Sequence, residues 1–280
     1  MECFRKKIPG LKTQTIPYKK SIVSYLRLGS GPRVLVCFHG YGESANAFHF
    51  LERAKSNHSI IAIDLPFHGD GAWNETQFLS ANDLVEIIDI IIRKEEFLSD
   101  RFSLCGFSLG GRVALSLFER IPDRIESVTL LAPDGLKLNF WYWFATQTST
   151  GRRLFLFTMK QPSWFFLFLS LLHKLRFVNA SFYKFVRYYV GDHNARMLLY
   201  NRWNILRGLR PNIKAIRKSI KDHQTRVVIV YGKHDRIILP SRGEKFRKGI
   251  VEYCTIKIIS AGHQVLHEKH ANELFPILFR

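Results

Sequence analysis

Gly106-Phe107-Ser108-Leu109-Gly110 places a serine between two glycines, and the flanking sequence predicts where that serine lies. The preceding run, residues 101–105, is short and largely apolar, which is typical of a buried strand. Residues 111–120 have the composition of a helix. A sharp turn between a strand and a helix exposes a serine hydroxyl, and glycines on both sides avoid collisions with the neighbouring backbone. We therefore predict that Ser108 is a nucleophile on a strained strand-to-helix turn.

The length and composition favour a globular protein with a sizeable core. The chain has 280 residues, of which 46% are hydrophobic. Its cysteines, Cys3, Cys37, Cys105 and Cys254, form no CxxC pair, and two of them lie in apolar runs, so we expect reduced thiols. The N-terminal segment 1–9 is basic but lacks the apolar stretch of a signal peptide, and no apolar run reaches the ~20 residues of a membrane span. These features predict a cytoplasmic location.

The charge is strongly basic, with 42 Lys and Arg against 23 Asp and Glu and a net charge of +19. Such an excess fits an anionic substrate or peripheral contact with an anionic membrane surface, here the inner surface of the membrane, or it serves solubility alone. No nucleic-acid-binding module is visible, so we expect no nucleic-acid partner.

Apolar runs alternate with helical segments along the first half of the chain, a pattern that predicts a mostly parallel, doubly wound α/β sheet with helices on both faces. A helix is expected from about residue 47 to 55, and another begins after Ser80, a good N-cap with Asp83 three positions later. A final helix is expected over 268–279. The predicted strands are residues 20–28, for which we expect a partner strand earlier in the chain, and residues 33–38, 59–63, 101–105, 126–132, 226–231 and 254–259.

The α/β pattern is interrupted over residues 136–215, which we predict to be a helical cap inserted between the sixth and seventh core strands. This window holds 19 of the 38 aromatic residues, 13 Lys and Arg, and a single acidic residue, Asp192. Residues 1–135 and 216–280 would then form the core. The aromatic side chains either line a substrate pocket or bury one another inside the cap. Helices are expected over 140–147, 151–159, 163–175, 181–190 and 193–209.

Three polar residues follow strand ends in the order Ser108, Asp235, His263. Sites in open parallel sheets form at the carboxyl ends of the strands, so these side chains are expected to meet. A serine hydroxyl needs a histidine to accept its proton and a buried carboxylate to orient that histidine. We predict these roles for His263 and Asp235, with Asp134, at another strand end, as the alternative acid.

The oxyanion hole of such a site needs two backbone N–H groups. We assign one to Leu109, directly after the serine, and the other to Tyr41 in the glycine-containing loop His39-Gly40-Tyr41-Gly42. His39 is expected to bond neighbouring backbone, and Asp64 to have a structural role. No metal-ligand cluster is apparent, so we predict no metal site and no cofactor.

These motifs together resemble the α/β-hydrolase superfamily, and within it the serine hydrolases with a helical cap. The resemblance rests on residues 39–44, 64–69, 106–111, 232–235 and 262–263, spread over most of the chain. It implies an α/β-hydrolase fold and a serine esterase that cleaves a carboxylic ester or thioester of a hydrophobic or acyl substrate. Two alternatives remain open: a carbon–carbon bond hydrolase or lyase using the same triad, and a non-catalytic binding module on the same fold. The substrate and the oligomeric state stay unassigned.

Overall fold

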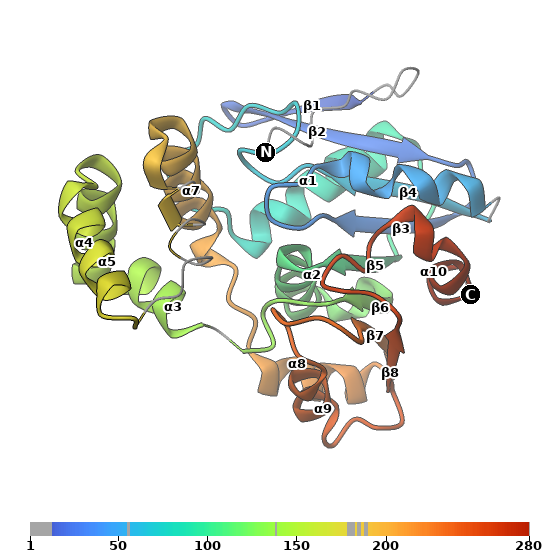
Figure 1. The fold of residues 1–280 in the computed structure, drawn as a ribbon. Helices are drawn as coiled ribbons and strands as arrows, with labels where there is room; N and C mark the ends of the chain where they lie inside the picture. Colours follow the sequence, from blue (N-terminus) through green and yellow to red (C-terminus); the bar gives the residue numbers. More distant parts are fainter. Residues whose placement is uncertain are drawn as a thin grey trace. The chain divides into compact units, whose positions relative to one another are not determined.

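The computed structural model describes residues 13–54, 57–137, 139–177, 183, 186–187 and 190–279. An eight-stranded sheet has the order β1-β2-β4-β3-β5-β6-β7-β8 (Figure 1). The six strands β3 to β8 are parallel to one another, whereas β2 pairs antiparallel with both β1 and β4. This confirms the predicted α/β class. The strands are β1 (Gln14–Tyr18), β2 (Ser21–Leu28), β3 (Arg33–Phe38), β4 (His58–Ile63), β5 (Phe102–Phe107), β6 (Ile125–Leu131), β7 (Arg226–Gly232) and β8 (Cys254–Ile259).

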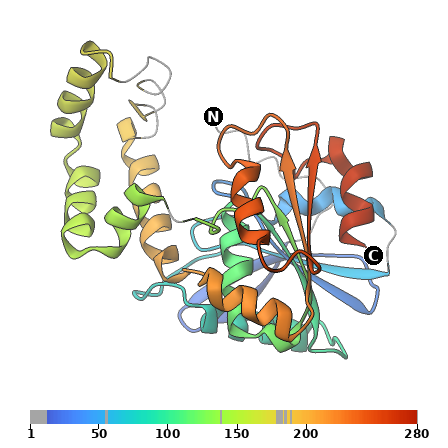
Figure 2. The same cartoon turned by 90° about the horizontal axis from the view of Figure 1, so that it is seen from below.

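Helices cover both faces of this sheet. On one face α1 (Ala81–Lys94) and α8 (Ile213–Asp222) pack against α2 (Leu109–Arg120), and α9 (Pro240–Arg247) follows β7. The other face carries the 3-10 helix η1 (Ala45–Ala54), which packs against α10 (Ala271–Leu278), as Figure 2 shows. The central strands are therefore buried on both faces, which explains why their sequences are continuously apolar.

The segment expected to be an α-helix near residues 47–55 is a 3-10 helix instead. Four of its side chains are buried, and three of them, Ala45, Phe48 and Leu51, recur at every third position; the fourth is Phe50. A 3-10 helix has 3.0 residues per turn, so this spacing places all three on the face that contacts the sheet. The C-terminal segment likewise begins with a short 3-10 turn, η4 (Glu268–His270), before α10.

The start of α1 is fixed by a capping box. Ser80 Oγ accepts a hydrogen bond from the Asp83 N–H, and the Asp83 carboxylate accepts one from the Ser80 N–H. Tyr18 and Lys19 also donate to Asp83, each at 2.6 Å. Burial raises the pKa of the Asp83 carboxyl, but the hydrogen bonds from Lys19, Ser80 and Tyr18 lower it by more, so the net pKa lies well below its usual range.

Three cysteines, Cys37, Cys105 and Cys254, are free and buried; Cys3 lies outside the described residues. Cys37 on β3 and Cys105 on β5 are register partners in neighbouring parallel strands, and neither is exposed. Cys254 begins β8. Burial raises the pKa of the Cys37 thiol, and it raises the pKa of the Cys254 thiol to about 12, so these sulfurs stay protonated and unreactive in the folded protein.

Residues Leu138–Arg207 form a separate compact unit, and the rest of the chain forms the other. The helical unit is shorter than the window 136–215 defined by composition. Helix α8, which the boundary at 215 would cut, belongs to the sheet-containing unit, where Ile216 and Ile220 are buried. The helical unit contains α3 (Phe140–Gln147), α4 (Ser149–Lys160), α5 (Ser163–Lys174) and α7 (His193–Ile205). The helix expected over 181–190 falls largely outside the described residues.

The interior of the helical unit is built from aromatic rings and one buried arginine. The Trp203 ring lies 5.0 Å from that of Tyr142 and 5.4 Å from that of Phe155, centroid to centroid. Arg196 donates to the carbonyl oxygens of Met159 and Val190 at 2.6 and 3.0 Å, so a buried guanidinium satisfies backbone acceptors near the end of α4. Part of the aromatic excess of the insertion thus forms the core of its own unit.

Candidate active site

Ser108 lies between β5 and α2 with a strained backbone, φ +49° and ψ −112°. Three hydrogen bonds hold this conformation: the Ser108 N–H donates to Leu131 O at 2.9 Å, and Ser108 O accepts from the N–H groups of Gly111 and Asp134 at 2.9 and 2.8 Å. The turn is thus determined by neighbouring strands and by the first turn of α2, which compensates the strain at the serine.

The flanking glycines are required by close backbone approach, as predicted. A Cβ at Gly106 would lie 2.3 Å from Gly110 O, and a Cβ at Gly110 would lie 1.9 Å from Phe38 O. Both distances are far inside van der Waals contact, and the obstructing atoms are backbone atoms that cannot move aside. The sequence pattern around Ser108 therefore reflects the tight packing of the turn against β3.

His263 follows β8 and reaches the serine. Its Nε2 lies 3.0 Å from Ser108 Oγ, and its Nδ1 lies 2.8 Å from Asp235 Oδ2. The ring also packs near Phe107, with centroids 5.6 Å apart. The structure thus brings together three side chains that are separated by 127 and 28 positions in the chain. Each follows the carboxyl end of a parallel strand.

Asp235 follows β7, and its fully buried carboxylate uses both oxygens. Oδ1 accepts hydrogen bonds from the N–H groups of Ile237 and Ile238 at 2.7 and 3.0 Å. Oδ2 is left facing His263 Nδ1, and a carboxylate there can only accept, so Nδ1 carries the proton. His263 Nε2 is then the acceptor and faces the serine hydroxyl, which is the tautomer that proton abstraction from Ser108 requires.

The alternative acid, Asp134, is engaged elsewhere. Its Oδ2 lies 3.3 Å from Nε of the buried Arg112, and its Oδ1 accepts the Gly135 N–H at 2.8 Å. Among the described residues, the carboxylate contacting His263 is that of Asp235. The geometry therefore favours Asp235 over Asp134 as the partner of the histidine.

The loop after β3 contains residues whose role sequence reasoning missed. Glu43 Oε2 accepts the Gly40 N–H at 3.1 Å, and Glu43 Oε1 accepts from Gln264 Nε2 at 2.7 Å. This carboxylate ties the loop of Tyr41 to the residue directly after His263. The spacing of Gly40 and Glu43 is that of a local side-chain-to-backbone turn, which was a usable signal. The hydrogen bond to Gln264, 221 positions away in the chain, had no comparable signal in the sequence.

The oxyanion roles of Tyr41 and Leu109 stay predictions. Leu109 is the first residue of α2, where backbone N–H groups have no acceptor within the helix. Tyr41 lies in the turn with Gly42, which has φ +78°, and its partly exposed ring packs edge-on to His68.

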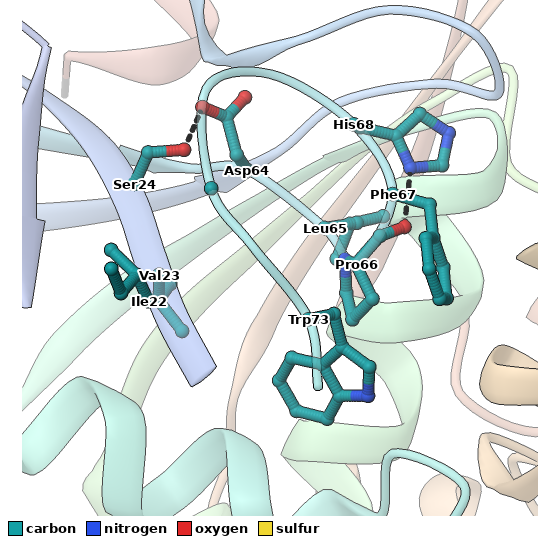
Figure 3. A pocket seen from close by; sticks show the side chains of 10 residues that line it. Ile22, Val23, Ser24, Asp64, Leu65, Pro66, Phe67, His68 and Trp73 are labelled. Carbon is teal, nitrogen blue, oxygen red and sulfur yellow. Dashed lines mark hydrogen bonds between the residues drawn. The ribbon is translucent and has the colours of Figure 1, made fainter. Parts of the chain in front are cut away.

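Residues beside this loop have structural contacts, as expected for His39 and Asp64. His39 Nδ1 bonds Gly40 O at 2.8 Å, and its Nε2 accepts the Leu65 N–H at 3.0 Å, so the ring is neutral. Asp64 accepts from Ala45 N–H and from Ser24 Oγ, the second contact being drawn in Figure 3. The small cavity in that view is lined by residues of β2 and of the loop after β4, and by none of the predicted catalytic side chains. Within the described part of the chain, no three His, Cys, Asp or Glu side chains are placed to hold a metal ion.

Comparisons with known proteins agree with this architecture. The family model described as "alpha/beta hydrolase fold" matches residues 33–270. The chain is 26% identical, over 76% of its length and 81% of the relative's, to a pimeloyl-[acyl-carrier protein] methyl ester esterase from Nitrosomonas europaea. It is 26% identical, over 39% of its length and 40% of the relative's, to a putative 2-succinyl-6-hydroxy-2,4-cyclohexadiene-1-carboxylate synthase from Bacillus subtilis. A thioesterase domain from the curacin biosynthetic pathway has a similar fold, with a TM-score of 0.60 at 17% identity over 96% of this chain and 99% of that one.

Proposed function

The chain belongs to the alpha/beta hydrolase fold family, and we propose that it cleaves a carboxylic ester or thioester of a hydrophobic substrate through a covalent acyl-enzyme. The single observation that carries the proposal is the chain of contacts from Ser108 Oγ through His263 to Asp235, at 3.0 and 2.8 Å. The similarity to a methyl ester esterase over most of both chains supports an ester substrate. Among neighbours of known structure, a thioesterase domain shares the fold.

In the proposed reaction Ser108 Oγ attacks the substrate carbonyl carbon while His263 Nε2 takes the hydroxyl proton. The carbonyl oxygen becomes an oxyanion, which the N–H groups of Leu109 and Tyr41 bind. His263 then gives the proton to the departing alcohol or thiol, and the tetrahedral intermediate collapses to an acyl-serine. Water attacks this acyl group with His263 again as the base, which releases the carboxylic acid and restores Ser108. Asp235 keeps His263 in the reactive tautomer and stabilises its imidazolium form throughout.

The inserted helical unit, Leu138–Arg207, is the segment that we propose selects the acyl group. The serine, histidine and aspartate motifs are common to enzymes with different substrates, so they cannot specify one. A variant in which this unit is replaced by a short Gly-Ser linker should still label at Ser108 with a fluorophosphonate and should lose its preference among p-nitrophenyl esters of graded chain length. An unchanged preference would place selection in the sheet-containing unit.

A second candidate function is carbon–carbon bond cleavage or elimination at the same triad. The observation that favours it is the similarity to the carboxylate synthase relative, which covers about two fifths of each chain. A non-catalytic binding role is the third candidate function. The contacts that join Ser108, His263 and Asp235 argue against it.

The test is a substrate panel with purified protein. We expect hydrolysis of p-nitrophenyl esters or acyl thioesters, fluorophosphonate labelling of Ser108, and loss of both in Ser108→Ala. Ser116→Ala is the matched control, because Ser116 lies in α2 and its buried Oγ has no hydrogen-bond partner among the described residues. Turnover of carbon–carbon substrates without ester hydrolysis would support the second function. Absence of labelling at Ser108 would support a binding role.

A further inference from the structure

Helix α5 exposes the apolar side chains that a helix of a globular unit would bury. Trp164, Leu167, Phe168 and Leu171 are 38%, 76%, 50% and 53% exposed. Their spacing of three and four residues places them on one face of the helix. Leu169 is the buried member of α5. The exposed stripe is therefore a continuous apolar surface along about two helical turns.

The stripe continues onto α4. The Phe157 ring stacks on that of Trp164, with centroids 6.4 Å apart, and Phe157 and Leu154 are 53% and 43% exposed. The two helices thus share one exposed apolar surface, which we call the outer apolar face. Contiguous apolar surface of this kind marks a site of interaction. It consists of Leu154, Phe157, Trp164, Leu167, Phe168 and Leu171.

Basic residues flank the outer apolar face, and acidic residues are missing from the whole segment. Arg153 and Lys160 are exposed on α4 at the helical spacing of Phe157, and Lys174 is exposed on α5 three residues after Leu171. No Asp or Glu occurs in the sequence between residues 136 and 191. An apolar stripe with Trp, Phe and Leu beside Lys and Arg is the composition of a helix that lies in the interface of an anionic bilayer.

We propose that the outer apolar face of α4 and α5 docks the protein on the surface of an anionic lipid bilayer. The apolar side chains enter the boundary between headgroups and acyl chains, and the flanking Lys and Arg contact lipid phosphates. A second copy of the chain fits less well, because pairing two such faces would bring cations together with no acid between them. No single described helix is long and apolar enough to cross a membrane; α4 and α5 meet that criterion only as a pair, and they are bent by 93° at the break.

The experiment is flotation of the full-length protein with vesicles of phosphatidylcholine alone, or of equal parts phosphatidylcholine and phosphatidylglycerol. We expect binding to the anionic vesicles, release by high salt or alkaline carbonate, and little binding to the neutral ones. Leu167→Ser with Phe168→Ser should weaken binding by at least about tenfold, since both side chains leave water on docking. The matched control is Leu98→Ser with Val251→Ser, which removes two exposed apolar side chains outside the helical unit.

A second pair of variants tests the charges. Lys160→Gln with Lys174→Gln should weaken binding by about tenfold or more, because each basic residue near the surface contributes a factor of about five. Lys221→Gln with Lys248→Gln, exposed lysines of the other unit, should change it little. Thermal unfolding checks that every variant is folded, so the test is independent of any activity at Ser108.

Several results would overturn the proposal. These are absence of binding, equal binding to neutral and anionic vesicles, or unchanged binding of the Leu167 and Phe168 variant. Retention after the carbonate wash would instead indicate insertion of the α4–α5 pair. A dimer seen in sedimentation without lipid and lost in the Leu167 and Phe168 variant would identify the face as a self-association surface.

Discussion

Replacing Asp235 by asparagine is the sharpest test of the site because it changes protonation with little change in shape. The native Oδ1 accepts two backbone N–H groups, from Ile237 and Ile238. In Asp235→Asn the amide oxygen has to stay with those two donors, since an NH₂ group cannot accept from them. The NH₂ group then faces His263 Nδ1 and donates to it. This forces the ring proton onto Nε2, where it opposes the Ser108 hydroxyl.

The expected loss in kcat is about 10⁴-fold, equivalent to about 5.5 kcal/mol in activation free energy, which is the magnitude found when the wrong histidine tautomer is imposed on a serine triad. The free energy of unfolding should change little, because the contacts to Ile237 and Ile238 are kept. The assay is the burst and steady-state hydrolysis of a p-nitrophenyl ester, with the rate of fluorophosphonate labelling as a second readout.

The control is Asp134→Asn, which perturbs the contact with Arg112 and leaves His263 untouched. Its kcat should stay within about threefold of the native value. A loss of less than tenfold in Asp235→Asn, or a larger loss in Asp134→Asn, would refute the assignment of the acid.

Three further predictions follow from contacts described above. Ser108 has φ +49°, a backbone conformation that glycine adopts with less strain than alanine. The free energy of unfolding of Ser108→Gly, measured by urea titration, should therefore be about 1 kcal/mol larger than that of Ser108→Ala. Equal stabilities would argue against backbone strain at the turn. Glu43 accepts from two donors and an amide can accept from only one of them in that geometry, so Glu43→Gln should lower kcat about tenfold with little change in KM; an unaffected kcat would make the tie between the loops dispensable. The lowered pKa of Asp83 means that the native state favours its ionised form, and Asp83→Asn should therefore cost about 1–2 kcal/mol of unfolding free energy at pH 7. That difference should shrink as the pH falls below ~4, where the unfolded carboxyl becomes protonated, and a pH-independent difference would contradict the linkage.

Much of the sheet was predictable because the central strands, β3 to β7, are short apolar runs that end in breakers. The positions of Ser108, Asp235 and His263 after such runs predicted their meeting, since parallel strands place their carboxyl ends at one edge. The order of the sheet and the tie between Glu43 and Gln264 depend on pairings of distant segments, which a local pattern does not encode.

The helical structure of the insertion was predictable from the sequence, but the packing of its helices was not. Residues 164–172 are almost all apolar, so no periodicity distinguishes the side that packs inward from the side that is exposed. Composition also misplaced the end of the insertion. Lys214 counts toward the basic window but belongs to α8, whose apolar residues Ile216 and Ile220 are buried in the sheet-containing unit.

The buried cysteines can be used to measure local opening of the sheet, because a thiol reagent reaches them only when the strands around them separate. A thiol reacts only where a reagent can reach it, and Cys37 and Cys105 are fully buried while β3 and β5 remain paired between other strands. Cys254 lies on the edge strand β8, which pairs with one neighbouring strand, β7. The rates at which a maleimide modifies these positions therefore rank the opening of the sheet from its edge to its centre, without any label having to be introduced.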